Sequence, residues 1–523
     1  MARHEGISAR KLLQDETRLV ECSPHGRLRI AVGYPNSYHV AHSSLAYQWV
    51  TRLTGATHEV GVERFVADSH LAGRTLESET PLGNLDVLAF SCSFELDAVN
   101  ILRILDSAGI PRLSNERAAR HPLIVVGGAI ASINPLPLSP AVDVFCLGAA
   151  ELLLPNLLAA IQDTPEREKL LEDLAAQDGY FIPRHHLDSM GKPIGRRRRL
   201  EKRDHHMAAK GSVPFSHIVT PHTEYSERAL IEMSRGCPEK CRYCWVSYNY
   251  GRLRCYPTEA ILARVDELSH ITNRLGFVAT AVGDHPELPH ILEYCREREL
   301  EVALSSLRIP AMVPEILQPL ADSGARSVTI APETGSDDLR RRLSKPIPNS
   351  RILEAVETAQ RCGIENLKMY FIIGLPGESD DDIRSISTLL RESRATILGH
   401  ARQRGRMGNL HAGISILVPK PYTPYHREAM LTAAEARRRI RILRQELKGM
   451  PNIKLDIPSY GQARWQGYLS RGGVQAFHAI SAAASGSAPK QVMADYKQAV
   501  DAATTSQPTD DPGWSFISSA PSG

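Results

Sequence analysis

Short apolar strand patterns alternate with helical patterns over most of the chain, and this alternation limits the folds open to it. In a first stretch the strand patterns are 28–32, 86–90, 123–126 and 142–147. In a second stretch, which begins at Ala229, they are 276–282, 301–306, 327–332, 366–375 and 411–419. Strands that alternate with helices form parallel sheets covered by helices. The sequence therefore predicts two α/β domains, and the wide strand spacing of the second favours a curved or closed sheet.

The loops that follow the strands of the first domain are its candidate binding segments, because ligands of such sheets lie beyond the carboxyl ends of the strands. These loops are 33–44, 91–97, 127–137 and 148–151. Gly127 and Gly128 follow an apolar strand. Two glycines at this position allow the backbone to approach a large flat ligand, and a tight turn is the structural alternative.

The composition excludes several classes of protein. Of the 523 residues, 42% are hydrophobic, and 62 Lys and Arg against 59 Asp and Glu leave a net charge of +3. This charge gives no overall attraction to nucleic acid or to a membrane. The apolar runs are far shorter than the roughly 20 residues that cross a bilayer, and the N-terminal residues lack the apolar stretch of a secretory signal. We therefore expect a cytoplasmic protein without a membrane span.

Three of the nine cysteines are clustered, and they carry the strongest chemical signal. Cys237, Cys241 and Cys244 have the spacing C-x3-C-x2-C directly after a predicted strand. Three thiolates on one short loop can hold three irons of a cubane cluster and leave the fourth iron open. A structural zinc site usually needs four protein ligands, and Cys255 is eleven residues further on. The spacing therefore favours a 4Fe-4S cluster over zinc or unrelated thiols.

At these residues the loop resembles that of the radical S-adenosylmethionine (radical SAM) enzymes, with Tyr243 at the aromatic position of the C-x3-C-x-aromatic-C motif. The resemblance implies a 4Fe-4S cluster and SAM, from which the reduced cluster makes a 5'-deoxyadenosyl radical. It also implies a partial (β/α)6 barrel and an electron donor such as flavodoxin or ferredoxin. Members of the family place SAM contacts at strand ends. The matching positions here are Gly283 and Asp284 for the amino group, Ser306, Arg308, Glu333 and Lys345 for the carboxylate and ribose, and Gly374, Pro376 and Gly377 for the adenine.

The first domain resembles the Rossmann-like domain of the cobalamin-binding radical SAM subfamily, and the whole similarity covers residues 28–480. It implies that cobalamin contacts the strand-end loops 33–44, 91–97 and 127–137. The residues in question are Tyr38, His39, Ser91, Gly127 and Gly128. The chain lacks the D-x-H-x-x-G motif that supplies a histidine to cobalt in other cobalamin proteins. We therefore expect cobalamin to be base-off with no histidine on the metal.

Three hypotheses of function follow. The first is a cobalamin-dependent methyltransferase acting on an unactivated carbon or a phosphinate-type centre, with an unidentified substrate. The second is a radical SAM enzyme that modifies tRNA or a ribosome-linked molecule without cobalamin, in which arginines 196–199 and the helix 437–448 contact RNA. The third is a sensor that does not catalyse a reaction, which Tyr243 and the glycine turn at 374–377 disfavour.

The patterns divide the chain into six parts. The prediction is an N-terminal extension (1–27), a Rossmann-like cobalamin-binding-type domain (28–162), a linker (163–225), a radical SAM core (226–420), a C-terminal helical region (421–480) and a disordered tail (481–523). The tail is assigned because small and polar residues dominate it.

Overall fold

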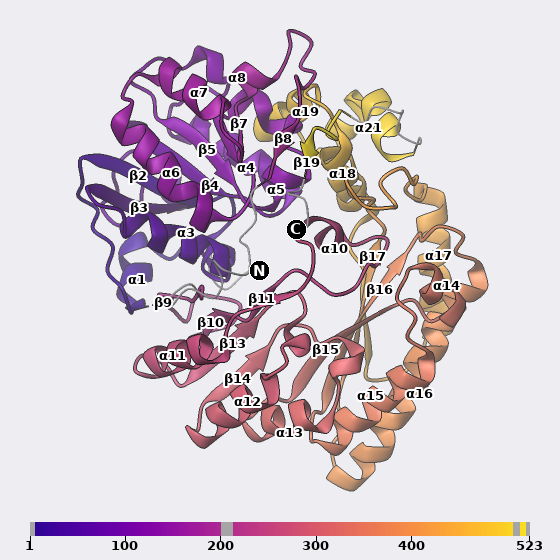
Figure 1. The fold of residues 1–523 in the computed structure, drawn as a ribbon. Coiled ribbons are helices and arrows are strands. Elements are labelled where there is room, and N and C mark those ends of the chain that lie inside the picture. The colour runs from indigo at the N-terminus through magenta and orange to yellow at the C-terminus, as the bar shows by residue number, and fades with distance from the viewer. Residues whose placement is uncertain (1–5, 200–212, 506–512, 519–523) are drawn as a thin grey trace.

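The computed structural model describes residues 6–199, 213–505 and 513–518, whose fold is shown in Figure 1. An N-terminal α/β body, coloured indigo to purple, lies beside a second α/β body, coloured magenta to orange. Helices from the C-terminal part of the chain return to the first body. Within the described residues, no helix combines the length and the apolar composition that crossing a bilayer requires.

A six-stranded sheet forms the centre of the N-terminal body. In spatial order its strands are β3 (Val60–Val66), β2 (Leu28–Tyr34), β4 (Val87–Ser91), β5 (Leu123–Gly127), β6 (Val144–Cys146) and β7 (Tyr180–Phe181). Neighbouring strands are parallel except for the antiparallel pair of β6 and β7. Parallel strands buried on both faces give continuous apolar runs, which explains why four of these strands were predictable.

Helices cover both faces of this sheet. One face carries α3 (Leu45–Gly55), α6 (Ala150–Asp163) and α7 (Arg167–Ala175). The other carries α4 (Ala98–Ser107), α5 (Ala129–Ile133) and the C-terminal helix α19 (Ala476–Ala484). The predicted Rossmann-like arrangement is therefore correct, and a helix from the far end of the chain completes it.

Two strands of the sheet are absent from the sequence prediction. β3 carries Glu63 and Arg64, and these buried charged residues interrupt its apolar run. β7 has only two residues, which leave no periodic signal. Because β7 pairs with β6 and α7 packs on the sheet, the predicted boundary between domain and linker at 162 is wrong. The connector begins after Phe181.

Parallel strands of the second body form two sheets that together make the predicted partial barrel. The first has β10 (Ala229–Glu232), β13 (Arg274–Val278) and β14 (Glu301–Leu304), and the second has β15 (Ser327–Glu333), β16 (Asn366–Ile373), β17 (Leu410–Ile416) and β18 (Ile453–Asp456). The amide of Leu307 donates to the Thr329 carbonyl (2.9 Å) between the sheets. Helices lie on the convex side (Figure 1): α11 (Thr258–Ser269), α12 (Leu288–Glu297), α13 (Pro314–Asp322), α15 (Asn349–Arg361), α16 (Asp380–Arg404) and α17 (Ala433–Glu446).

Short strands join distant parts of the chain. In the N-terminal extension, α1 (Ala9–Gln14) precedes β1 (Thr17–Arg18), which pairs with β9 (Ile218–Val219) of the connector. In the same connector, β8 (Arg197–Arg198) pairs with β19 (Ile517–Ser518) near the C-terminus. The described residues of the extension and of the connector therefore form part of the folded structure.

The prediction of a disordered tail is wrong for the described residues after Ser481. Two further helices follow α19, namely α20 (Pro489–Asp495) and α21 (Lys497–Thr504). Trp514, Phe516 and Ile517 then pack in the same core as Phe181 of the N-terminal sheet. Alanine-rich helices pack closely without large side chains, so the composition of this region conceals its order. Residues 506–512 and 519–523 lie outside the described part.

Candidate cluster and cofactor site

The loop with three cysteines is fixed at both ends. At its base, β11 (Ser234–Arg235) pairs with β12 (Arg254–Cys255), and α10 (Trp245–Asn249) begins directly after Cys244. Gly236 has a φ of +81°, and a Cβ there would lie 2.2 Å from the Arg252 carbonyl oxygen. Only glycine fits this position. The amide of Cys237 donates to the Gly251 carbonyl (3.2 Å) and holds the start of the loop.

The three thiols suit a cluster better than a single ion. Cys237 and Cys241 are buried and Cys244 is half-buried. Burial, together with the nearby Cys244, raises the pKa of Cys237 and raises that of Cys241 to about 11. Among the described residues, no three His, Cys, Asp or Glu side chains converge on one point that could hold a metal ion. A cubane takes each thiolate at a different corner, so its ligands do not converge, and its iron charge favours the thiolate form.

Tyr243, Glu333 and Lys345, which come from separate segments, meet beside this loop. The Tyr243 hydroxyl donates to Glu333 Oε1 (2.7 Å), and Lys345 Nζ donates to the same oxygen (2.8 Å) and to the Ala331 carbonyl (2.6 Å). Glu333 is buried and has a φ of +68°, an unusual backbone for a residue with a Cβ. Strain of this kind is found mostly at functional sites.

Arg308 connects the cysteine loop to two other loops of the barrel. Its guanidinium forms ion pairs with Asp284 and with Glu239, which lies between Cys237 and Cys241. Asp284 Oδ2 is buried and has no hydrogen-bond partner among the described residues. A buried acceptor without a partner fits the predicted contact with an amino group. Sequence reasoning missed Glu239, whose only signal is its place inside the cysteine motif.

Gly283 and Ser306 differ in their surroundings. A Cβ on Gly283 would lie 2.4 Å from the Cβ of Ala311, so this glycine permits close packing of two turns. Ser306 is exposed just beyond the end of β14. The predicted SAM contacts of both residues stay predictions.

The glycine turn after β16 is held from below by a buried carboxylate. The Gly374 amide donates to Glu378 Oε2 (2.6 Å), and Arg439 of α17 pairs with the same carboxylate. Gly374 (φ +90°) and Gly377 (φ +71°) have left-handed backbones, and a Cβ on Gly374 would lie 2.8 Å from Leu431. The turn therefore requires glycine for backbone reasons. Its predicted place beside the adenine stays a prediction.

We expect Glu333→Gln to weaken SAM binding more than it lowers thermal stability. The substitution keeps the size of the side chain but removes its negative charge. That charge pairs with Lys345, and the carboxylate oxygen accepts the hydrogen bond of Tyr243. Equilibrium dialysis of SAM and a thermal melt measure the two effects. Glu315→Gln on the outer helix α13 is the control. Unchanged SAM affinity would place the ribose contact elsewhere.

A small apolar cavity lies in the N-terminal body under the predicted cofactor loops. It has a volume of about 70 Å³ and lies between the sheet and helices α3 and α6. Ser91, Gly127, Gly128 and Gly148 line its upper part, together with Cys146. A Cβ on Gly128 (φ +94°) would lie 2.5 Å from the Cys92 carbonyl oxygen, whereas a Cβ on Gly127 would meet only Cys146, at 3.8 Å. Gly128 is therefore needed by the backbone, and Gly127 leaves open space.

In loop 33–44, the side chain of Tyr38 bonds to the N-terminal extension and does not point to the predicted cofactor. Tyr38 is buried, its hydroxyl donates to Glu16 Oε1 (2.6 Å) and its ring stacks on His42 (3.8 Å between centroids). Glu16 in turn pairs with the buried Arg64 through two 2.8 Å contacts. Burial, together with Arg64, lowers the pKa of His42 to about 3, which keeps it neutral. Tyr38 thus anchors the N-terminal extension, while His39 is half-buried at the loop and its cofactor contact stays a prediction.

The carboxyl edge of the N-terminal sheet faces the second body. In loop 91–97, Glu95 accepts from Ser470 Oγ (2.7 Å) and pairs with Lys420. In loop 127–137, Asn134 donates to the carbonyls of Ser470 (3.1 Å) and Gly472 (2.7 Å) at the end of the C-terminal helix α18 (Tyr460–Arg471), which packs in the core of the N-terminal body. The third of these loops, 148–151, meets the cysteine loop directly.

An ion pair makes this last contact. Arg235, two residues before Cys237, contacts Glu151 at the start of α6 (2.8 and 3.2 Å) and also Glu232. Trp49 donates to the same Glu151 (3.0 Å). Both charged side chains of the pair are largely buried. The strand-end loop 148–151 and the base of the cluster loop are therefore joined by a short, mostly buried contact.

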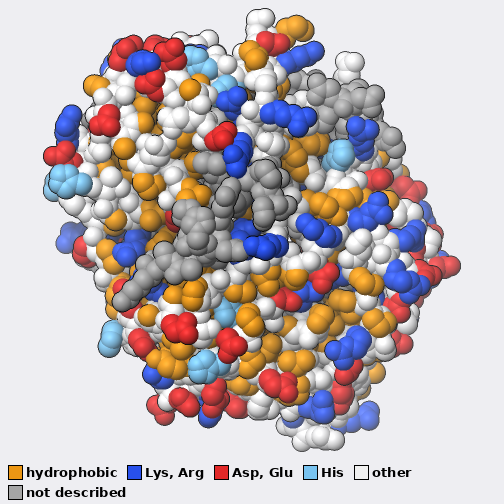
Figure 2. All heavy atoms as spheres, viewed as in Figure 1, with side chains coloured by type: hydrophobic (Ala, Val, Ile, Leu, Met, Phe, Trp, Pro, Cys, Tyr) orange, Lys and Arg blue, Asp and Glu red, His pale blue; other side chains and the backbone are white. Residues whose placement is uncertain are grey.

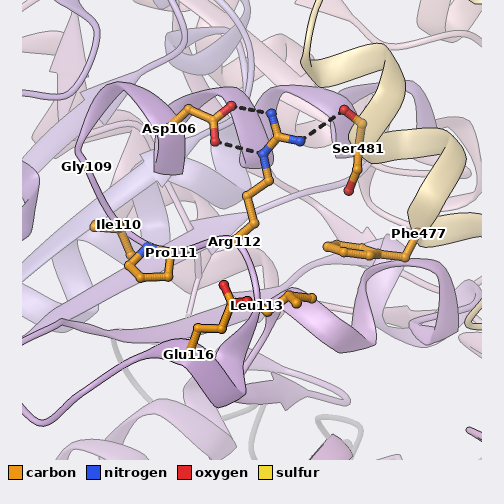
Figure 3. A pocket seen from close by; sticks show the side chains of 9 residues that line it. All are labelled: Asp106, Gly109, Ile110, Pro111, Arg112, Leu113, Glu116, Phe477 and Ser481. Atoms are coloured by element: carbon orange, nitrogen blue, oxygen red, sulfur yellow. Dashed lines mark hydrogen bonds and ion pairs between the residues drawn. The ribbon is translucent and has the colours of Figure 1, made fainter.

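An open pocket of about 570 Å³ lies elsewhere, between the loop after α4 and helix α19. Figure 3 shows Arg112 between Asp106 and Ser481, with Phe477 across the opening. The loop after α4 leads into the amino end of β5, so this pocket lies at the edge of the sheet opposite to the cofactor loops. It is not part of the candidate site.

The fold and the cysteine loop define a radical SAM protein, and comparison with known families agrees. Residues 56–183 match the family "Radical SAM proteins, N-terminal" and residues 231–390 match the "Radical SAM superfamily". The chain belongs to the radical SAM superfamily and is a radical SAM enzyme, as predicted. Its cofactors are therefore a 4Fe-4S cluster and SAM, as in the rest of this family.

Similar sequences cover different shares of the chain. An uncharacterized protein of Methanocaldococcus jannaschii, MJ0966, is 22% identical over 85% of this chain and 88% of its own length. The ribosomal protein uS12 methylthiotransferase RimO of Nitratidesulfovibrio vulgaris is 25% identical over 43% of this chain. Only 55% of RimO is matched, so the chain spans about half of that relative.

Two solved structures share the architecture. The radical SAM methyltransferase TsrM from Kitasatospora setae, bound to cobalamin and a [4Fe-4S] cluster, is 13% identical, with a TM-score of 0.57 over 91% of this chain and 100% of TsrM. The cobalamin-dependent radical SAM enzyme OxsB, with aqua-cobalamin and SAM bound, is 14% identical, with a TM-score of 0.53 over 91% of this chain and 72% of OxsB. At these identities the likeness concerns the fold, and it confirms the predicted fold class.

Proposed function

We propose that the protein is a cobalamin-dependent radical SAM enzyme that transfers a methyl group to an unactivated substrate centre. One observation carries the proposal: two strand-end loops of the N-terminal sheet contact the barrel, one through Glu95 and Lys420 and the other through Glu151 and Arg235, the arginine that precedes the cluster loop. A cofactor on these loops would lie beside the barrel mouth. The shared fold of TsrM and OxsB supports the same arrangement.

The residues of the N-terminal domain fit a corrinoid. Gly127 and Gly128 leave the carboxyl edge of the sheet without side chains, so the backbone there is open to close approach by a large flat group. His42 does not suggest a metal ligand, since it is buried and contacts the Tyr38 carbonyl and Arg64 through its ring nitrogens. The chemistry that bound cobalamin supplies is methyl carriage. The protein itself holds loop 148–151 of the N-terminal sheet against the base of the cluster loop, through the ion pair of Glu151 with Arg235.

In the barrel, the described residues bind and orient. Tyr243 and Lys345 fix the carboxylate of Glu333 at a strand end, and Arg308 holds Asp284 beside the cluster loop. Both carboxylates keep oxygen atoms available to the polar groups of SAM. Polar groups at the carboxyl ends of barrel strands are where this type of fold places its reactions.

Modification of RNA or of a ribosome-linked protein is the second candidate, because RimO is among the similar proteins. The predicted RNA contacts weaken it. Arg199 is buried, with its guanidinium 5.4 Å from the Trp245 ring and 5.0 Å from the Tyr250 ring. Figure 2 shows basic and acidic side chains interspersed over the visible face. Residues 200–212, with the rest of the basic run, lie outside the described part.

Metal analysis separates the candidates. Protein purified without oxygen and incubated with hydroxocobalamin should retain iron and cobalt, and electron paramagnetic resonance of cob(II)alamin should show no nitrogen splitting. Iron without cobalt would favour the second candidate. Nitrogen splitting would mean that a histidine or the cofactor's own base is coordinated, and would overturn the base-off prediction.

Gly127→Leu tests the binding loop directly. The cavity at Gly127 has room for a side chain, so we expect the variant to fold and to lose cobalamin while it keeps its iron. Absorbance and metal content measure both. Gly109→Leu is unsuitable as a control because of its left-handed backbone, so Gly399→Leu, on an open helix surface, serves instead. Retention of cobalamin by Gly127→Leu would move the site away from loop 127–137.

A reducing compartment suits this function. The cysteines are unpaired, and an iron–sulfur cluster needs thiolate ligands that stay reduced. We therefore also propose a cytoplasmic location and an electron donor of the flavodoxin or ferredoxin class.

A further inference from the structure

The concave face of the barrel carries a cluster of aromatic and charged side chains that the cofactors do not account for. Along β16, Leu367, Met369, Phe371 and Ile373 are buried against the outer helices. The alternate residues Lys368 and Tyr370 are exposed, so they point to the concave side. Tyr370 retains 37% exposure, which is high for a large ring inside a barrel.

The neighbouring strands are shaped around Tyr370. Tyr370 lies beside Gly413 of β17, which lies beside Asp456 of β18. A Cβ on Gly413 would be 2.7 Å from Tyr370 Cδ1, so the ring lies across the glycine. One face of the ring rests on the sheet and the other stays accessible. A side chain at position 413 would displace it.

Charged groups and a second ring surround this tyrosine. Lys368 Nζ lies 4.9 Å from the centre of the Tyr370 ring. The hydrogen bond to Tyr370 and the charges of Glu224 and Asp456 raise the pKa of Lys368, which is therefore cationic. Tyr225, 41% exposed, interacts with Glu224 and Tyr370. The backbone amide of Glu224 donates a hydrogen bond to Ser43 Oγ of the N-terminal body (2.9 Å).

This cluster lies directly below the reacting end of the barrel. The next concave position above Tyr370 is Ile372, which packs in one apolar cluster with Tyr243 of the cysteine loop. Two residues of a strand cover roughly 7 Å. A molecule resting on Tyr370 would therefore reach the layer of Tyr243.

We propose that this face binds the substrate, and that the substrate carries a planar aromatic ring, stacked on Tyr370, and an anionic group, paired with Lys368. Exposed aromatic rings stack on planar ligands, and a lysine beside them provides a point charge for a carboxylate or phosphate. The inference rests on the proposed function, because a substrate binds inside the barrel only if the proposed reaction takes place there.

Binding of small probe molecules tests the proposal without turnover. The cluster-loaded, SAM-bound protein is titrated with 2-naphthoate, 2-naphthyl phosphate, 2-naphthamide and the saturated decalin-2-carboxylate, by isothermal titration calorimetry. We expect one of the two naphthyl anions to bind at least roughly tenfold more tightly than the amide and the decalin acid. The stronger anion identifies the natural group. Equal or undetectable binding of all four probes would overturn the proposal.

Variants locate the binding. Tyr370→Leu and Gly413→Ala should each weaken the favoured anion roughly tenfold, the first by removing the ring and the second by displacing it. Lys368→Met should abolish the preference for the anion over the amide. Tyr294→Leu is the matched control, since Tyr294 forms a cation–π pair with Arg298 on the outer helix α12. Unchanged affinity in both Tyr370→Leu and Gly413→Ala contradicts the site. SAM cleavage by each variant is measured separately, so that loss of the radical SAM function is distinguished from loss of the substrate site.

Discussion

Replacing Cys241 with alanine is expected to remove the iron–sulfur cluster and reduce SAM cleavage below detection. Cys241 is buried on the short loop that also carries Cys237 and Cys244, and a cluster held by three thiolates does not survive with two. Iron content should fall from about four atoms per chain, and 5'-deoxyadenosine should no longer form after anaerobic reconstitution and reduction. The same result is expected for Cys237→Ala and Cys244→Ala.

Cys362→Ala provides the matched control. This cysteine is buried at the end of α15, away from the cluster loop, and it should leave iron content and SAM cleavage unchanged. A triple-alanine variant of the loop that kept its iron and its activity would contradict the assignment. Such a result would require ligands from outside the cysteine motif.

Replacing Arg235 with alanine is expected to destabilise the contact between the two bodies by about 3 kcal/mol. The variant leaves Glu151 and Glu232 facing each other, largely buried, without their cation. The carboxylates then repel, and Trp49 loses a well-placed acceptor. The first thermal transition should move to lower temperature, and the fluorescence of Trp49 should change with it. Cobalamin affinity should fall as well, because loop 148–151 loses its support.

Arg296→Ala separates this effect from the loss of any surface ion pair. Arg296 pairs with Glu293 on the outside of α12, where both side chains are nearly half exposed, and its removal should leave the first thermal transition almost unchanged. Arg235→Lys should lie between the two, since lysine keeps the charge but loses the planar fork. Equal stability of Arg235→Ala and Arg296→Ala would mean that the pair does not hold the domains together.

The strands that could be predicted are those buried on both faces. The runs at 86–90 and 123–126 are continuous and apolar, and they became β4 and β5. β3 was not predictable, because Arg64 sits in its middle and is neutralised by Glu16 from an extension far away in sequence. The prediction of a disordered tail was wrong for a related reason. Its order comes from packing on the N-terminal domain, which no local pattern records.

The candidate site was predictable where one short segment carries it. The cysteine loop and the glycine turn each have a local motif. The meeting of Tyr243, Glu333 and Lys345 was expected only through the family resemblance, and the structure now gives its geometry. Glu239 and the pair of Arg235 and Glu151 had no signal, since each depends on two segments that the fold brings together.

The pairing of β8 with β19 has a consequence for biosynthesis. Phe181 of the N-terminal sheet packs against Phe516, with ring centres 4.9 Å apart, although more than 300 residues separate them. A ribosome that adds about 5–20 residues per second needs roughly 20 to 70 s between the two. During that interval the first domain is without part of its core, so its exposed apolar surface is open to chaperones. Loops 91–97 and 127–137 also lack their partners Ser470 and Gly472 until late in synthesis, so we expect the cobalamin loops to be completed only when the chain is nearly finished.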